Sequence, residues 1–187
     1  RAVTAQITIG HDSSGKPAEF DIEELLATRL LVQGNSGSGK SHLLRRLLEE
    51  SAGMVQQVVI DPEGDFPSLA DKFGHVVIDG AAYSPGEIEA LARRIREHWY
   101  PALVVVDEAQ MFAPAAAGEV AEDTRRMTMT AMTNLMCRGR KRGLAGIVAT
   151  QRLAKLAKNV AAESSNFLMG RTFLDIDMIR AAARRLE

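Results

Sequence analysis

The sequence predicts an α/β fold in which a mainly parallel central sheet is flanked by helices on both faces. Short apolar segments of β character alternate with segments of helical periodicity, a pattern typical of parallel sheets with helical crossovers. The most β-prone segment, residues 102–106, is an unbroken apolar run, as expected for a central strand that is covered on both faces. With 187 residues, 46% of them hydrophobic, the chain is long enough for one domain with a sizeable core.

The N-terminal part is expected to form two short strands, a helical turn and then the first strand of the main sheet. Residues 6–10 alternate between apolar and polar side chains, and residues 20–22 are the expected returning strand. A helical turn follows at residues 23–26. The apolar run at residues 30–32 predicts a buried strand, and the leucines of residues 43–48 have helical spacing.

The middle of the chain contains two further predicted strands and a well-marked helix start. Residues 57–61 form an apolar strand that ends in an acid, and residues 75–79 repeat this pattern. Ser84 is a suitable N-cap, Pro85 suits the first helical position, and Glu87 completes a capping box.

The C-terminal half is predicted to hold a long helix from about residue 119 to residue 137, two strands and a last helix. The strands are residues 146–150 and 167–169, and Asp175 is the expected N-cap of the last helix. The inner face of the long helix is expected to consist of Val120, Met127, Ala131 and Leu135.

Composition limits the functional classes. The net charge of −1 gives no global basic field of the kind found in free-standing nucleic-acid binders, although a ring can concentrate basic residues on its inner surface. The single cysteine, Cys137, rules out an internal disulfide and suits a reducing cytoplasm. No apolar run reaches membrane-spanning length, so we expect a cytoplasmic protein without a membrane partner. Because the chain begins at Arg1 and not at Met, we expect it to be a fragment.

A glycine-rich loop between the strand at 30–32 and the following helix fits the phosphate-loop pattern of Gly, four free positions and Gly-Lys-Ser. Glycines allow backbone N–H groups to converge on phosphate oxygens, and the helix N-terminus adds partial positive charge. The sequence therefore predicts a nucleoside triphosphate site. Its expected binding residues are Gly34, Asn35, Ser36, Gly37, Ser38, Gly39, Lys40, Ser41 and His42.

Four side chains are expected to supply the chemistry of this site. Lys40 would reach the terminal phosphates, and Ser41 would bind Mg²⁺. Asp107 follows the central strand, which ends beside the phosphate loop in this architecture, and is the second expected Mg²⁺ residue. Glu108 points elsewhere on an extended chain and would activate the attacking water as general base. The alternative is that Glu108 only caps the following turn.

A basic cluster at residues 138–142 follows the long helix. One interpretation is a solvated helix end that is favoured by the helix dipole. The other is an arginine that reaches the γ-phosphate in a neighbouring subunit, for which the glycines at 139 and 143 would give freedom of movement. Gln151 follows the strand at 146–150 and would sense the γ-phosphate by a hydrogen bond.

Five segments occur in one order that resembles the HerA branch of the HerA/FtsK superfamily of ring-forming ATPases. Three positions differ from the usual family pattern: Glu63 and Asp65 replace His and Glu in the second segment, and Gln110 stands where His is common. The segments are residues 34–41, 61–65, 106–110, 138–143 and 150–152.

The resemblance implies a RecA-like P-loop NTPase fold and a homo-hexamer. It also implies that Asp61 lies near the metal and the water, and that a trans-acting arginine comes from Arg138, Arg140 or Arg142, with Arg140 and Arg142 favoured. Family members commonly carry an N-terminal β-barrel. We therefore expect residues 1–28 to be strands that join such a barrel, which we expect to be missing or reduced in this sequence, and residues 29–187 to form the ATPase core of a single domain, 1–187.

The expected function is that of an ATP-hydrolysing motor domain of a hexameric translocase or helicase. It would use ATP and Mg²⁺, act on double-stranded DNA, and work with a nuclease or another effector protein. Two alternatives stay open: a nucleotide-gated ring that scaffolds an effector, for example in phage defence, and a secretion- or conjugation-type ATPase of the same superfamily. The sequence lacks the Leu-Ser-Gly-Gly-Gln signature of transporter ATPases and the Asn-Lys-x-Asp signature of GTPases.

Overall fold

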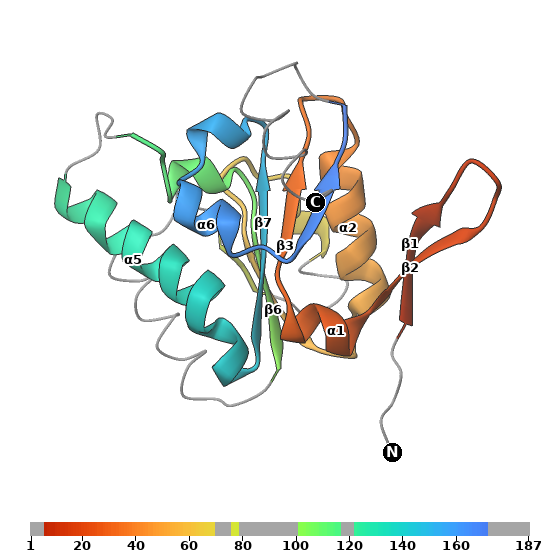
Figure 1. The fold of residues 1–187 in the computed structure, drawn as a ribbon. Helices are drawn as coiled ribbons and strands as arrows, with labels where there is room; N and C mark the ends of the chain where they lie inside the picture. Colours follow the sequence, from red (N-terminus) through yellow and green to blue (C-terminus); the bar gives the residue numbers. More distant parts are fainter. Residues whose placement is uncertain (1–5, 70–75, 79–100, 117–121, 172–187) are drawn as a thin grey trace.

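A computed structural model describes residues 6–69, 76–78, 101–116 and 122–171 (Figure 1). The predicted helix that begins at Ser84 and the last helix after Asp175 lie outside these residues.

The main sheet has six strands, and all neighbouring pairs within it are parallel. The strand order is β5-β4-β6-β7-β3-β8, which places β6 in the interior of the sheet. This confirms the predicted α/β class and the central position of the apolar run. The strands are β3 (Leu30–Gln33), β4 (Gln56–Ile60), β5 (Val76–Ile78), β6 (Ala102–Val106), β7 (Leu144–Thr150) and β8 (Asn166–Met169).

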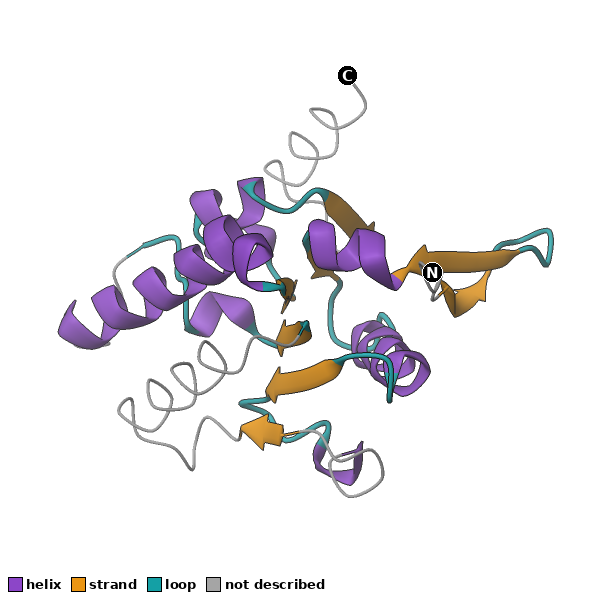
Figure 2. Ribbon diagram, turned by 90° about the horizontal axis from the view of Figure 1, so that it is seen from below, coloured by secondary structure: helices purple, strands orange, loops and turns teal. Residues whose placement is uncertain are grey.

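Helices cover both faces of this sheet. α2 (Lys40–Ser51) packs on one face, and α5 (Glu122–Arg138) and α6 (Lys158–Ala162) pack on the other, as Figures 1 and 2 show. Because strand side chains alternate, β3 contributes to both cores: Val32 belongs to the core beneath α2, and Leu31 to the core beneath α5 and α6. Leu44 of α2 and Met136 of α5 are fully buried in these two cores.

The predicted inner face of α5 is wrong by one residue. Met127 is 46% exposed and Ala131 is also exposed, whereas Met132 and Met136 are buried. Of the other two predicted residues, Leu135 is half-buried, and Val120 lies outside the described residues. The cause lies on β7, where Gly146 leaves room for a side chain from the helix: a Cβ atom added to this glycine would lie 2.4 Å from Met136 Sδ. The flexible thioether of Met136 fills this space and fixes the rotation of the helix.

Replacing Gly146 by Ala is therefore expected to lower the free energy of unfolding by about 1–3 kcal/mol, since the added methyl overpacks a closed core. Chemical denaturation monitored by circular dichroism measures the change. Gly10→Ala is the matched control, because no atom lies within 4 Å of the position that its Cβ would take. Equal unfolding midpoints for the two variants would contradict this packing.

A separate antiparallel hairpin precedes the main sheet, and it is formed by β1 (Gln6–His11) and β2 (Pro17–Asp21). Figure 1 shows it projecting from the side of the domain beyond α2, while Ile7 at its root is buried in the core beneath α2. The chain then enters α1 (Ile22–Ala27), whose N-cap is Asp21: its carboxylate accepts the N–H of Glu23 at 2.7 Å. The two predicted N-terminal strands and the helical turn are thus confirmed.

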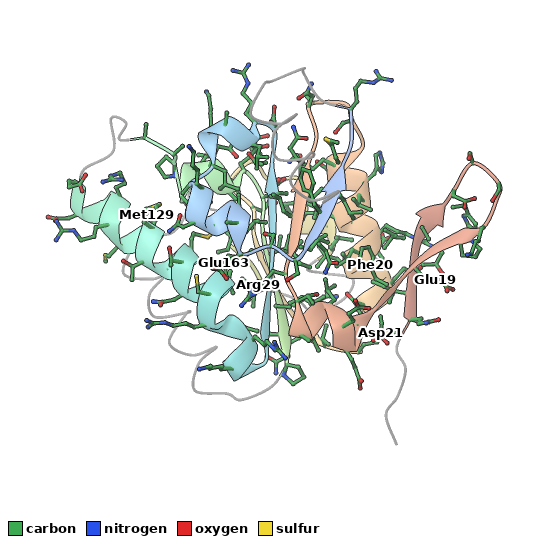
Figure 3. The ribbon with its side chains drawn as sticks, viewed as in Figure 1. Glu19, Phe20, Asp21, Arg29, Met129 and Glu163 are labelled. Carbon is green, nitrogen blue, oxygen red and sulfur yellow. The ribbon has the colours of Figure 1, made fainter. Side chains whose placement is uncertain are left out.

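Arg29 joins three elements at the end of the domain where β3 begins. Its guanidinium donates to the backbone oxygens of Glu163 and Cys137, each at 3.3 Å, and Figure 3 shows Arg29 beside Glu163. The oxygen of Cys137 belongs to the last turn of α5, where a cation satisfies free carbonyl groups. Within the described part of the chain, no helix combines the length and the apolar character needed to cross a bilayer.

Candidate nucleotide-binding and catalytic site

The functional side chains gather where neighbouring parallel strands end. Gln33 of β3 pairs with Thr150 of β7, and Ile60 of β4 pairs with Val106 of β6. The carboxyl ends of these four strands therefore form one edge of the sheet. In open α/β sheets this edge is where ligands bind. The residues that follow β4 and β6, Asp61 and Asp107, lie at the same edge and are both buried.

The phosphate loop connects β3 to α2 at this edge. Gly37 and Gly39 have φ angles of 73° and 90°, a left-handed conformation that glycine adopts without steric cost. Gly39 is the N-cap of α2 and Lys40 is its first residue, so the loop ends at a helix N-terminus with partial positive charge. Ser36 and His42 are exposed, while Gly34 is buried and donates its N–H to the Thr150 oxygen at 3.2 Å.

Lys40 is buried between two acids. Its Nζ atom lies 2.5 Å from Asp107 Oδ1 and 3.2 Å from Glu108 Oε1. Burial works against the charged form, but the two carboxylates outweigh it and raise the pKa of Lys40 above its usual value. A cation that stays protonated at the mouth of a glycine loop is suited to bind the terminal phosphates of a nucleotide.

The site carries more negative than positive charge. Burial raises the pKa of Asp107 despite its contact with Lys40. Glu63, on the exposed loop after β4, also has a raised pKa: partial burial is the main cause, and repulsion from Glu108, Asp107 and Asp65 adds to it. An excess of carboxylates around one lysine favours a divalent cation.

Glu108 has an unusual backbone conformation and a crowded carboxylate. Its φ of 46° is the only positive value among the described non-glycine residues. It is the N-cap of a short 3₁₀ helix, η1 (Ala109–Met111), but its side chain makes no capping hydrogen bond. Its carboxylate instead accepts hydrogen bonds from the side-chain amides of Gln110 and Gln151. Burial alone would raise the pKa of Glu108, but these two amides and Lys40 together lower it.

The residues proposed for Mg²⁺ fit the ion in their chemistry. The Ser41 hydroxyl and the Asp107 carboxylate are oxygen donors, which Mg²⁺ prefers. The Ser41 hydroxyl donates to Asp65 Oδ2 at 2.9 Å, so a second carboxylate lies next to it. In the described residues, no three His, Cys, Asp or Glu side chains are placed to hold a metal by themselves. The protein would therefore supply part of the shell and leave the rest to phosphate oxygens and water, as is usual for Mg²⁺.

Asp61 makes contacts to the backbone. Its two carboxylate oxygens accept the N–H groups of Gly64, Asp65 and Phe66 at 2.9–3.1 Å. Asp61 thereby closes the loop that places Asp65 next to Ser41.

The predicted basic cluster lies at the opposite edge of the sheet. Arg138 ends α5, and the 3₁₀ helix η2 (Gly139–Arg142) leads into the first residue of β7. The Gly143 oxygen accepts the N–H of Ala102, at the start of β6. Since β6 and β7 are parallel and the phosphate loop lies beyond their other ends, the structure does not bring Arg140 to the site of its own chain.

Three residues at the site had no assigned role in the sequence analysis. They are Asp65, Gln110 and Thr150. The position of Thr150 could have been noticed in the sequence, because it is a polar residue at the end of an apolar strand. Thr150 is fully buried, so its hydroxyl needs a hydrogen-bond partner at the strand tip. Gln110 lies in the short 3₁₀ helix η1 and Asp65 in the loop after β4, where sequence spacing does not indicate the direction of a side chain.

A cavity adjoins the phosphate loop on the side of the hairpin. Its lining includes the apolar side chains of Ile9, Val32, Leu43 and Leu168 and the phosphate-loop residues Ser38 and Gly39. An apolar cavity next to a phosphate site is suited to a flat nucleobase.

Comparison with known proteins identifies the family. Residues 7–136 match the family described as the central domain of helicase HerA. No curated protein matches the sequence.

Solved structures share the fold at low identity. One of them is the genome packaging NTPase B204 from Sulfolobus turreted icosahedral virus 2, in complex with ATP-γ-S. It is 17% identical with a TM-score of 0.62, and the match covers 86% of this chain and 83% of B204. The cytoplasmic domain of EssC is 15% identical with a TM-score of 0.71, and the match covers 94% of this chain and 38% of EssC. The pCW3 conjugation coupling protein TcpA is 19% identical with a TM-score of 0.73, covering 96% of this chain and 58% of TcpA.

Proposed function

The chain belongs to the family of the HerA helicase central domain and is a P-loop ATPase domain of the HerA/FtsK type. We propose that it is the motor of a ring that hydrolyses ATP to move along double-stranded DNA. The observation that carries the proposal is the contact of Lys40 with both Asp107 and Glu108 at the edge of the sheet beside the phosphate loop. This arrangement would supply a phosphate-binding cation in Lys40, a metal-holding acid in Asp107, and a second acid, Glu108, that becomes available for water activation once Lys40 turns to the phosphates.

The nucleotide is bound by the loop and the start of α2. Backbone N–H groups of residues 34–41 and the Lys40 ammonium would hold the phosphates, and the cavity lined by Ile9 and Leu168 would hold the base. When Lys40 turns to the phosphates, it releases Glu108. Bound Mg²⁺ would neutralise charge on the phosphates, held by Ser41 and Asp107 with Asp65 beside them.

Glu108 is the proposed general base. A carboxylate with a lowered pKa is ionised at neutral pH, so it is ready to accept a proton from water. Gln151 donates to Glu108 Oε1 at 2.9 Å and would contact the γ-phosphate or the attacking water from the same position. Asp61 fixes the loop that ends next to Ser41 and so acts on the metal side of the site through the backbone.

Positive charge at the γ-phosphate is proposed to come from a neighbouring subunit of a homo-hexamer. The support is geometric: the cluster of Arg138, Arg140 and Arg142 lies at the edge of the sheet away from the phosphate loop, while in a head-to-tail ring this edge can face the next subunit's nucleotide. Arg140 is exposed, as an arginine that acts in trans must be.

Arg140→Ala is expected to reduce ATP turnover by about 10³-fold or more in the assembled protein while leaving ATP affinity unchanged. The direct check is to mix this variant with Lys40→Ala subunits, each inactive alone. Mixed rings contain interfaces with an intact phosphate loop on one side and an intact Arg140 on the other, so part of the activity should return. Lys141→Ala, an exposed neighbour, is the matched control. Mixed rings as inactive as each parent would contradict the trans role.

The polymer is proposed to be double-stranded DNA, contacted by exposed basic residues such as Lys155 and Lys158, with a nuclease or another effector as the partner. The test is ATP turnover of the full-length protein with and without double-stranded DNA, at increasing salt. A motor on DNA should be stimulated several-fold, and the stimulation should fall as salt rises. Turnover that is indifferent to DNA would favour a protein-moving ATPase or a nucleotide-gated scaffold.

A further inference from the structure

A chain of three hydrogen-bonded side chains leads from the tip of β7 to Glu108. Thr150 Oγ1 lies 2.7 Å from Gln110 Oε1, and Gln110 Nε2 contacts Glu108 Oε2. The Thr150 residue is fully buried, and Glu108 is 3% exposed. This chain uses the carboxylate oxygen that Lys40 and Gln151 do not touch, since both of these contact Oε1.

The Glu108 carboxylate fixes which group donates in each of these hydrogen bonds. An ionised Glu108 only accepts hydrogen bonds, so the Gln110 amide must present its NH₂ group to it. The amide oxygen then faces Thr150, whose hydroxyl must donate. The shorter distance from Thr150 Oγ1 is to Gln110, at 2.7 Å, against 3.3 Å to the Arg152 oxygen, and the same hydroxyl accepts the Arg152 N–H at 3.2 Å. The Thr150 hydroxyl therefore anchors the amide oxygen and holds the Gln110 amide in the orientation that Glu108 requires.

These hydrogen bonds between Thr150, Gln110 and Glu108 matter most after the nucleotide binds. Lys40 then leaves Glu108 for the phosphates, and a glutamate side chain with three rotatable bonds loses one of its anchors. The Gln110 amide remains on Oε2, opposite the Gln151 contact, and keeps the carboxylate in one rotamer. A general base must lie within hydrogen-bond reach of its water, so this restriction bears directly on the rate of hydrolysis.

We propose that Gln110 is a positioning residue that holds Glu108 in its water-activating orientation, and that Thr150 acts on the reaction only by orienting the Gln110 amide. This role rests on the proposed function, because it concerns the general base of ATP hydrolysis. This role also links the tip of β7, which continues into Gln151 and Arg152, to the position of the Glu108 carboxylate.

The test compares Gln110→Ala, Thr150→Val, Thr150→Ser and the double variant Gln110→Ala/Thr150→Val in the full-length protein. Valine has the shape of threonine without the hydroxyl, whereas serine keeps it. Gln110→Ala and Thr150→Val are each expected to lower kcat about tenfold or more with ATP affinity unchanged. Thr150→Ser should keep most of the activity. The double variant should be no slower than Gln110→Ala, because the Thr150 hydroxyl is proposed to act through the Gln110 amide and not through its longer contacts with the Arg152 backbone.

A measurement without nucleotide complements the kinetics. A crystal structure of the nucleotide-free Thr150→Val variant should show the Gln110 amide turned away from Glu108, with the fold unchanged. Thr133→Val is the matched control: its hydroxyl also bonds a side chain, accepting from Asn159 Nδ2 at 3.2 Å, but this contact joins α5 to α6 and involves none of the site residues. This variant should keep full kcat.

Three results would overturn the role. They are an unchanged kcat in Gln110→Ala, additive losses in the double variant, and a Thr150→Ser variant as slow as Thr150→Val. A loss of kcat that is matched by an equal loss of ATP affinity would likewise assign these residues to binding. The proposed function fails separately: an unmodified protein that binds ATP but does not hydrolyse it would contradict the ATPase proposal itself.

Discussion

Replacing Lys40 by Ala is expected to abolish ATP binding. The ammonium is the charged group of the phosphate loop, and it sits 2.5 Å from Asp107 and 3.2 Å from Glu108. Without it, the triphosphate would face two buried carboxylates with no protein cation between them. Repulsion then replaces attraction, and the expected loss of affinity is at least about 10³-fold. Isothermal titration calorimetry with ATP and Mg²⁺ measures the change.

The same substitution is expected to lower stability, because it leaves Asp107 and Glu108 buried and unpaired. Removal of one partner of a buried ion pair costs about 3–5 kcal/mol. Calorimetry must therefore be done well below the unfolding temperature of the variant, with circular dichroism as the check on folding. Lys158→Ala, an exposed lysine on α6, is the matched control and should bind ATP normally. A folded Lys40→Ala protein with unchanged ATP affinity would remove the phosphate loop from the proposed site.

Replacing Glu108 by Gln is expected to stop ATP turnover while ATP still binds. The amide has nearly the same shape as the carboxylate but cannot accept a proton from water, so kcat should fall by about 10²–10⁴-fold. Binding should be retained or tightened, because a negative charge next to the γ-phosphate has been removed. Single-turnover hydrolysis, measured alongside ATP affinity, separates the two effects.

The control for Glu108→Gln is Glu63→Gln. Glu63 belongs to the same group of acids but is exposed on the loop after β4, so its loss should leave kcat nearly unchanged. Hydrolysis by Glu108→Gln at more than about a tenth of the normal rate would assign the general base to another residue. A similar loss of kcat in both variants would point to the summed charge of the cluster and not to one base.

Much of the fold follows from local signals. The glycines of the phosphate loop lie between an apolar strand and a helix with leucines at helical spacing, and this context left one arrangement for residues 30–51. The unbroken apolar run at 102–106 indicated an interior strand, because both of its faces had to be covered. Parallel strands then bring Lys40, Asp107, Glu108 and Gln151 to one edge without any further information.

The rotation of α5 and the turn residues were beyond such signals. The face that α5 buries depends on the space above Gly146, a residue of another element, and the helix sequence offers methionines at several angles. Gln110 lies in the short 3₁₀ helix η1 and Asp65 in the loop after β4, where the direction of a side chain is set by the local backbone. The positive φ of Glu108 is a tertiary feature of this kind, because no property of glutamate favours it.

The most direct test of the central claim is a crystal structure of the protein with a non-hydrolysable ATP analogue and Mg²⁺. We expect the phosphates to lie on the backbone of residues 34–41, Lys40 Nζ to have moved from Glu108 to the γ-phosphate, and Mg²⁺ to lie beside Ser41 and Asp107. Glu108, still held by Gln110, should face a water in line with the γ-phosphate. An analogue bound elsewhere, or a Glu108 carboxylate turned away from the γ-phosphate, would contradict the account.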